Sequence, residues 1–203
     1  MIVRQIPVGP MQNFVYILGD EESHEALVVD CGWETSPIVS QANADALAIK
    51  VVVATHGHYD HVSTIFELAR ILGVEVVAHP DSDVKASTRV RNGDTISLGA
   101  KQVQVLQTPG HTSDSICLYD GENLFTGDTL FIDAWGRTDL PTGSPEELFN
   151  SIHEVIMRLP PTTVIYPGHD YGRVRSRSLV EESWTNPALL AGSLREFLSL
   201  TQD

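Results

Sequence analysis

Four segments of this 203-residue chain place a histidine or an aspartate beside a glycine where an expected β-strand ends. THGHYDH ends the strand KVVVAT, TPGHT ends KQVQVLQ, FTGD ends the second strand of a hairpin, and YPGHD ends TTVIY. Buried polar groups are costly without partners, whereas loops at strand ends are where a rigid sheet holds functional side chains. The fold must therefore bring several strand ends together, and the glycines allow the tight turns.

The pattern between these segments predicts an α/β protein. Residues 50–55 form a continuous apolar run, which is typical of a strand covered on both faces. Residues 61–72 have the apolar stripe of an amphipathic helix that stops at Gly73. We therefore expect two sheets packed together with helices outside them. No linker or short repeat divides the chain, so residues 1–203 are expected to form a single domain.

Turn and cap signals set the bounds of the expected elements. Asp120-Gly121 predicts a hairpin turn, and Ser144 with Glu147 matches a capping box at a helix start. The hydrophilic stretch 80–93 is expected to hold a short helix and a loop. The expected strands are 2–8, 14–18, 26–32, 50–55, 74–79, 94–99, 101–111, the hairpin 115–128 and 162–166, and the expected helices are 37–47, 61–72, 145–159 and a tail from about residue 179.

The four segments share the side chains that bind transition metals. Neutral imidazole and carboxylate are natural ligands of zinc, manganese and iron. His56 and His58 are two residues apart on one side of an extended segment, and the following turn lets Asp60 and His61 point elsewhere. This spacing suits two neighbouring metals and excludes the helical HExxH motif. The candidate ligands are His56, His58, Asp60, His61, His111, Asp128 and His169.

HGHYDH at 56–61, TPGHT, FTGD and YPGHD together resemble the ligand set of the metallo-β-lactamase-fold superfamily. The resemblance implies a four-layer αβ/βα sandwich of two mixed sheets with the metals at one edge. It also implies two divalent metal ions, with zinc expected and iron or manganese as alternatives. His56, His58 and His111 would hold the first metal, Asp60, His61 and His169 the second, and Asp128 would bridge them. Metal lowers the pKa of bound water, and Asp60 is the expected catalytic residue that orients the resulting hydroxide.

The segment FTGDTLFIDAWGRTDL resembles both glyoxalase II hydrolases and persulfide dioxygenases. Gly136-Arg137-Thr138-Asp139, YPGHDY and the later Asn186-Pro187 favour the dioxygenases, which use one Fe(II) on residues matching His56, His111 and Asp128. The intact ligand set favours a hydrolase, as in small glyoxalase II-like enzymes that lack the long C-terminal helical domain. We expect a metal-dependent thioester or ester hydrolase, with an iron persulfide dioxygenase as the alternative and a metal-binding scaffold as a third class.

Net charge and side-chain chemistry limit the kinds of partner that the protein can bind. A formal net charge of −14 argues against nucleic acid, and no apolar stretch is long enough to span a bilayer. A small-molecule substrate, such as a thiol conjugate, is expected, and a homo-oligomer stays open. The N-terminus has no secretory signal, which favours the cytoplasm. Arg137 could bind a substrate carboxylate or pair with Asp139 or Asp133, and Tyr171 and Tyr59 are candidates for lining the pocket.

Residues outside these motifs are expected to be structural. Cys31 and Cys117 form no spacing motif and are interpreted as small, partly buried apolar residues. The short basic run Arg173, Arg175 and Arg177 is expected to be a solvated face or a set of local ion pairs. Three histidines fall outside every motif and are taken as structural or surface residues; they are His24, His79 and His153.

Overall fold

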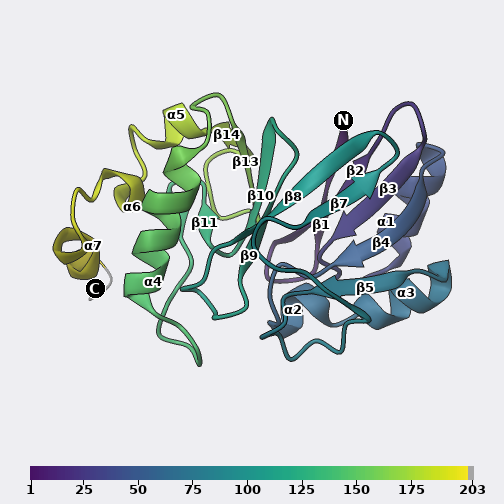
Figure 1. Ribbon diagram of the computed structural model, residues 1–203, viewed down its shortest axis with the longest axis horizontal. Coiled ribbons are helices and arrows are strands. Elements are labelled where there is room, and N and C mark those ends of the chain that lie inside the picture. Colours follow the sequence, from purple (N-terminus) through teal and green to yellow (C-terminus); the bar gives the residue numbers. More distant parts are fainter. Residues whose placement is uncertain (201–203) are drawn as a thin grey trace.

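The computed structural model describes residues 1–200 and contains two six-stranded sheets packed face to face (Figure 1). The first sheet has the strand order β1-β2-β3-β4-β5-β6, with bounds Ile2–Val8, Asn13–Gly19, Glu25–Val29, Ala48–Val53, Glu75–Ala78 and Thr88–Arg89. The second sheet has the order β14-β13-β10-β9-β8-β7, with bounds Arg177–Ser178, Val164–Pro167, Asn123–Gly127, Ile116–Tyr119, Lys101–Gln107 and Thr95–Leu98. A small hairpin of β11 (Leu130–Phe131) and β12 (Ala134–Trp135) lies beside them.

Both sheets are mixed. In the first sheet β1, β2 and β3 pair antiparallel, and β4, β5 and β6 continue in parallel from β3. In the second sheet β10 and β13 are the parallel pair, and β7, β8, β9 and β14 pair antiparallel. The parallel neighbours matter for function, because their carboxyl ends leave the sheet at the same edge.

Alternation along the strands builds three apolar layers. Phe14 and Tyr16 of β2 point between the sheets, whereas Val15 and Ile17 point to the helices outside. The outer layer of the first sheet packs on α1 (Ser36–Ala44), α2 (Tyr59–Val62) and α3 (Ile65–Leu72). The outer layer of the second sheet packs on α4 (Pro145–Asn150) and on the C-terminal helices α6 (Pro187–Leu190) and α7 (Leu194–Leu200).

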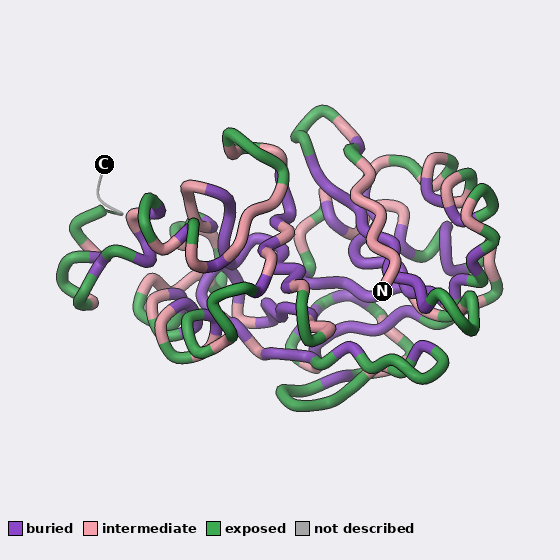
Figure 2. The backbone as a smooth tube through the Cα atoms, turned by 90° about the horizontal axis from the view of Figure 1, so that it is seen from above, coloured by how far each residue is buried: buried purple, intermediate pink, exposed green. Residues whose placement is uncertain are grey.

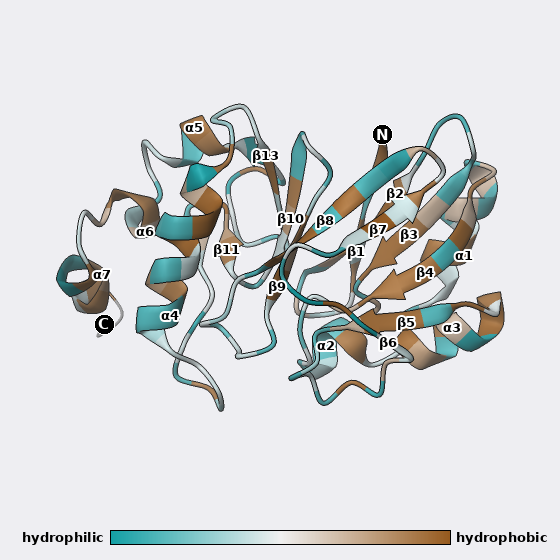
Figure 3. Ribbon diagram, viewed as in Figure 1, coloured by the Kyte–Doolittle hydropathy of each residue, from teal (hydrophilic) through white to brown (hydrophobic). Residues whose placement is uncertain are grey.

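The predicted four-layer αβ/βα sandwich is therefore confirmed. Figure 2 shows the buried backbone running through the middle of the molecule with exposed loops around it. Figure 3 shows hydrophobic residues concentrated along β4 and β5, as the continuous apolar runs predict. Within residues 1–200 no helix is long and apolar enough to cross a membrane.

The structure corrects several predicted helices. The helix expected at 61–72 is two helices, α2 and α3, separated at Ser63 and Thr64. Thr64 leaves the helical ladder because both its backbone N–H and its hydroxyl donate to the carbonyl of Cys31. The helix expected at 37–47 ends at Ala44, since Ala46 has a positive φ of 54°. No helix lies in 80–93; Thr88 and Arg89 instead add the edge strand β6 to β5.

The remaining boundary signals agree with the structure. The hairpin β9–β10 turns at Asp120-Gly121, and the Ser144 side chain accepts the backbone N–H of Glu147 at the start of α4. The helix expected at 145–159 continues beyond α4 as a π turn over Ser151–Val155 and a 3₁₀ turn over Ile156–Arg158. The predicted helical tail comprises α5 (Leu179–Glu182), α6 and α7, with Asn186 capping α6.

Candidate metal centre

The four polar segments meet at one edge of the sandwich. The segment with His56, His58, Asp60 and His61 follows β4 and enters α2. Asp128 follows β10 and His169 follows β13, which are parallel neighbours, and His111 follows β8 two strands away. The topology therefore delivers all seven predicted ligands to a common place from four separate stretches of chain.

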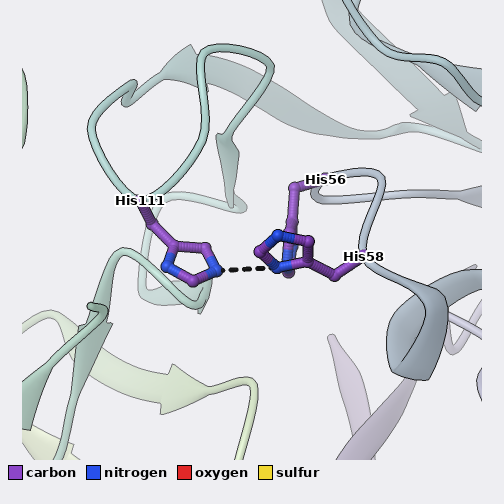
Figure 4. Close-up of side chains that lie close together, drawn as sticks. All are labelled: His56, His58 and His111. Atoms are coloured by element: carbon purple, nitrogen blue, oxygen red, sulfur yellow. Dashed lines mark hydrogen bonds between the residues drawn. The ribbon is translucent and has the colours of Figure 1, made fainter. Parts of the chain in front are cut away.

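Three histidines form the first cluster (Figure 4). The Nδ1 atom of His58 lies 3.0 Å from the Nε2 atom of His56 and 3.0 Å from the Nε2 atom of His111. Figure 4 shows the rings converging from the loop after β4 and the loop after β8. Such convergent ring nitrogens are the geometry of a metal site, because neutral imidazoles each offer one lone pair.

Asp60, His61 and His169 form the second cluster. The Nε2 atoms of His61 and His169 are 3.1 Å apart, and the Oδ2 atom of Asp60 lies 3.5 Å and 3.4 Å from them. Both imidazoles are buried, and the side chain of Asp60 is 14% exposed. Two nitrogens and one carboxylate oxygen thus face a common point beside the first cluster.

Asp128 lies between the two clusters. Its Oδ2 atom is 3.6 Å from His111 Nε2 and 3.3 Å from His169 Nε2, while its Oδ1 atom is 3.3 Å from His61 Nε2. Burial alone would raise the pKa of this carboxyl, but His61 and His169 hold it well below its usual range. In the described part of the chain, the buried Oδ1 atom has no hydrogen-bond partner.

The pKa shifts of the buried histidines are those expected of a site that binds a cation. Burial and the facing His61 lower the pKa of His56 well below its usual range, so this imidazole stays a neutral ligand. Burial would also lower the pKa of His61, but Asp128 and Asp30 raise it well above its usual range. A divalent ion could supply the positive charge that a protonated His61 otherwise provides. Together with the unpartnered Asp128 oxygen, these donors fit a divalent metal.

The second nitrogen of each buried imidazole has a protein partner. His56 Nδ1 lies 3.1 Å from the Thr55 hydroxyl, and His61 Nδ1 lies 2.8 Å from Asp30 Oδ2. The Nδ1 atoms of His111 and His169 donate to the carbonyls of Arg137 at 2.7 Å and Met11 at 2.8 Å. Such partners fix the ring orientation and leave Nε2 free for a metal.

Sequence reasoning missed Asp30 although a signal was present. Asp30 follows β3 in VVDCG, so it is a further strand-end carboxylate near a glycine. Besides its contact with His61, its carboxylate accepts the backbone N–H of Thr55 at 2.7 Å and the Thr55 hydroxyl at 2.9 Å. It therefore supports two ligand-bearing segments at once.

Asn13 and Trp33 were also missed, and no sequence signal pointed to them. The Asn13 amide donates to Asp60 Oδ2 at 2.8 Å, and the indole N–H of Trp33 donates to Asn13 Oδ1 at 2.8 Å. Because the indole fixes the amide oxygen, the amide NH₂ must face Asp60. This chain of hydrogen bonds holds the Asp60 carboxylate against His61 and His169.

We expect Asn13→Ala to lower the free energy of unfolding of the metal-free protein by about 1–3 kcal/mol. The truncation leaves the part-buried indole N–H of Trp33 without its acceptor and the Asp60 carboxylate without its Asn13 donor. Urea denaturation followed by circular dichroism measures the change. Asn43→Ala, at an exposed position of α1, is the control and should change stability by less than about 0.5 kcal/mol. An equal effect of both substitutions would contradict the structural role given to Asn13.

A cavity of 530 Å³ opens over the ligands. Its apolar wall includes Met11, Phe131 and Trp135, and the Tyr171 ring stacks on His169 with centroids 4.6 Å apart. Tyr59 also lines it but is 73% exposed and lies at the rim. The structure thus places Tyr59 and Tyr171 at this cavity, and their contact with a substrate stays a prediction.

Arg137 lines the cavity and at the same time forms an ion pair. Its guanidinium donates to both Asp139 oxygens, at 2.6 Å and 2.7 Å, in an exposed, bidentate pair. Of the alternatives considered from sequence, the pair with Asp139 is the one the structure contains. Asp133 instead binds Arg173 and Arg177.

The other predicted structural residues take the expected places. Arg173 and Arg177 pair with Asp133, and Arg175 pairs with Asp170, so the basic run forms local ion pairs. Cys31 and Cys117, predicted to be partly buried, are instead fully buried, and burial raises the pKa of each thiol to about 11. Among the histidines outside the motifs, His79 is buried and His153 stacks on Phe149.

An αβ/βα sandwich with two joined His/Asp clusters at one edge defines a class of metal-dependent enzymes. The chain belongs to the metallo-beta-lactamase superfamily, which residues 8–169 match. It is 35% identical over 173 residues to the "Probable polyketide biosynthesis zinc-dependent hydrolase PksB" of Bacillus subtilis, covering 82% of this chain and 77% of that protein.

Two further comparisons extend over nearly the whole chain. Human "Persulfide dioxygenase ETHE1, mitochondrial" is 35% identical over 204 residues, covering 98% of this chain and 80% of that protein. The crystal structure of ETHE1 from Myxococcus xanthus superposes with a TM-score of 0.94 at 34% identity and covers 100% of this chain and 91% of that one. The protein is thus an enzyme of this superfamily, and its clusters and relatives support a divalent metal.

Proposed function

We propose that the protein is an iron(II) persulfide dioxygenase. The observation that carries this proposal is the match to persulfide dioxygenase ETHE1 over 98% of the chain, together with the structural likeness to the Myxococcus protein. The sequence motifs alone favoured a glyoxalase II-like hydrolase with two zinc ions. The comparisons favour the alternative.

We propose that His56, His111 and Asp128 hold the iron. His56 belongs to the histidine cluster with His111, and its ligand atom also converges with those of His61 and Asp128. His56, His111 and Asp128 therefore lie where the first and second clusters adjoin. Two histidines and one carboxylate form a facial triad typical of non-haem Fe(II) oxygenases. Iron bound there would supply open coordination positions for dioxygen and for a substrate sulfur.

The protein's own residues would shape the rest of the reaction site. Phe131, Trp135 and Tyr171 supply apolar surface beside the ligands, which limits the access of water to a persulfide. The Asn13 amide holds the Asp60 carboxylate in place. The Asp60 carboxylate could there accept a proton or position a water molecule. In the overall balance, a persulfide, dioxygen and water give a thiol and sulfite, so the S–S bond breaks and the outer sulfur is oxidised. The substrate is thus a small thiol conjugate.

A binuclear zinc hydrolase is the second candidate. The observation that favours it is the intact second cluster of Asp60, His61 and His169, whose ligand atoms converge within 4.8 Å. The likeness to the Bacillus protein named as a zinc-dependent hydrolase points the same way. In this case Asp60 would bind the second metal and orient the attacking water.

Metal content and oxygen uptake decide between the two. We expect protein purified without added metal to contain one iron per chain, measured by plasma mass spectrometry. Glutathione persulfide should then drive oxygen uptake in an electrode, with one sulfite formed for each dioxygen consumed. Two zinc ions per chain, with hydrolysis of S-lactoylglutathione and no oxygen uptake, would refute the dioxygenase.

A further inference from the structure

A second cavity adjoins the metal centre on the other side of His58. It has a volume of 420 Å³, and His58 and Leu140 line both it and the metal cavity. We call it the Asp114 cavity. Its wall contains three carboxylates, those of Asp81, Asp83 and Asp114. Its other lining residues are Gly57, Thr112, Ser113, Pro141 and Thr142, so neither lysine nor arginine of residues 1–200 lines it.

Asp114 is the unusual member of this wall. The residue is only 6% exposed, and its Oδ2 atom is buried without a hydrogen-bond partner anywhere in the described chain. Outside the metal centre, two other buried carboxylates are satisfied: Asp30 accepts from Thr55, and Glu182 accepts from Arg177. A buried carboxylate oxygen without a donor is costly, and it indicates a missing donor that a ligand could supply.

The position of Asp114 Oδ2 connects it to the metal ligands. A Cβ atom at Gly57 would lie 3.3 Å from this oxygen, so the backbone between His56 and His58 forms its wall. A molecule in the Asp114 cavity could therefore extend past His58 to the metal cavity.

The chemistry of the cavity favours an organic cation over a metal ion. The three aspartates do not appear among the clusters of residues 1–200 whose ligand atoms converge closely enough for a metal. Carboxylates spread over a larger cavity, with the hydroxyls of Thr112, Ser113 and Thr142 among them, instead suit an ammonium group with three N–H donors.

We propose that the Asp114 cavity binds the protonated amine of an aminothiol substrate whose sulfur reaches the metal centre. The placement of the sulfur at the metal centre rests on the proposed function, whereas the placement of the amine rests on the Asp114 cavity itself. It narrows the substrate to thiols or persulfides that carry a primary ammonium group. It also gives Asp114 a role in substrate selection without contact with the metal.

Binding measurements on the iron-loaded protein test, without turnover, whether the Asp114 cavity binds the amine. Isothermal titration calorimetry would compare ω-aminoalkanethiols of increasing chain length, each paired with the hydroxyalkanethiol of equal length. At the best length we expect the amine to bind about tenfold tighter, as a charge-assisted hydrogen bond to a carboxylate implies. Equal affinities at every length would overturn the proposal.

Asp114→Asn tests the residue itself. The amide keeps the shape but loses the charge, so the amine preference should fall to about twofold or less. Glu22→Gln, in the exposed turn between β2 and β3, removes the same charge elsewhere and should keep the preference. The ligand-free Asp114→Asn protein should melt no lower than the wild type, since it loses an unpartnered buried charge. A preference that survives in Asp114→Asn would overturn the assignment.

The two proposals fail separately. An amine preference without oxygen uptake on any persulfide would refute the dioxygenase and leave the amine site standing. Oxygen uptake on glutathione persulfide without any amine preference would refute the amine site alone. Calcium binding that Asp114→Asn abolishes, again without amine preference, would overturn the assignment in favour of a metal site.

Discussion

Replacing His111 with alanine is expected to abolish both metal retention and activity while the protein stays folded. His111 contributes its Nε2 atom to the first cluster, and its Nδ1 atom is fixed by the Arg137 carbonyl. It lies after β8 in a loop, so its truncation removes no strand pairing. Losing only an outer partner of a metal ligand already costs about 10–100-fold in affinity. Loss of the ligand itself should exceed about 100-fold.

The measurements are metal content after gel filtration and oxygen uptake on glutathione persulfide. His24→Asn is the matched control, because His24 lies outside the metal centre and asparagine tolerates its positive φ of 59°. The control should keep wild-type metal content and rate. Circular dichroism of His111→Ala should match the wild type, which separates loss of a ligand from loss of fold. Full activity in His111→Ala would refute the assignment of the first cluster.

The fold was predictable because its signals are local and repeated. Residues 51–54 are apolar because the end of β4 packs between the helices and the second sheet. The strand-end histidines were predictable as a set for the same reason, since each of their segments follows an apolar run and contains a glycine. Helix breaks were harder to predict: α2 and α3 separate where Thr64 binds the Cys31 carbonyl, a contact between residues 33 positions apart.

The supporting residues of the site could not be predicted from local pattern. Asn13 and Trp33 are 20 positions apart and lie 47 and 27 positions from Asp60. Only the folded chain therefore shows that hydrogen bonds link Trp33 to Asn13 and Asn13 to Asp60. Asp114 is an ordinary loop residue in sequence, and its lack of a partner is visible only in three dimensions. Ligands follow from residue type and spacing, whereas their hydrogen-bond partners depend on tertiary contacts.

Replacing Glu182 with alanine is expected to give the largest loss of stability. Glu182 is fully buried and accepts from Arg177 at 2.8 Å, from the Asp133 backbone N–H at 2.9 Å and from the Asn186 amide at 2.9 Å. Truncation removes one acceptor of the Arg177 guanidinium. It also removes an acceptor from the Asp133 backbone N–H and from the Asn186 amide. Breaking such a buried pair typically costs about 3–5 kcal/mol. Because the Arg177 side chain is 18% exposed, we expect a value near the lower end, about 3 kcal/mol.

The same substitution should also reach the metal cavity. The Asn186 amide donates to the carbonyls of Phe131 and Ala134, both at 3.1 Å, so Glu182 helps hold the β11–β12 hairpin. Phe131, Ala134 and Trp135 of that hairpin line the cavity. A looser wall should raise KM for the proposed persulfide substrate more than it lowers kcat, because the metal ligands themselves are untouched.

Urea denaturation and steady-state oxygen uptake measure the two effects. Glu154→Ala is the matched control, because it breaks an exposed ion pair with Arg158 one helical turn away. Exposed pairs of this kind contribute about 0–1 kcal/mol, and KM should not change in the control. If Glu182→Ala destabilised the protein no more than Glu154→Ala, the hydrogen bonds of Glu182 would not be what stabilises the packing of the segment 177–186 on the β11–β12 hairpin. An unchanged KM in a clearly destabilised Glu182→Ala protein would instead show that the hairpin keeps its position without this carboxylate.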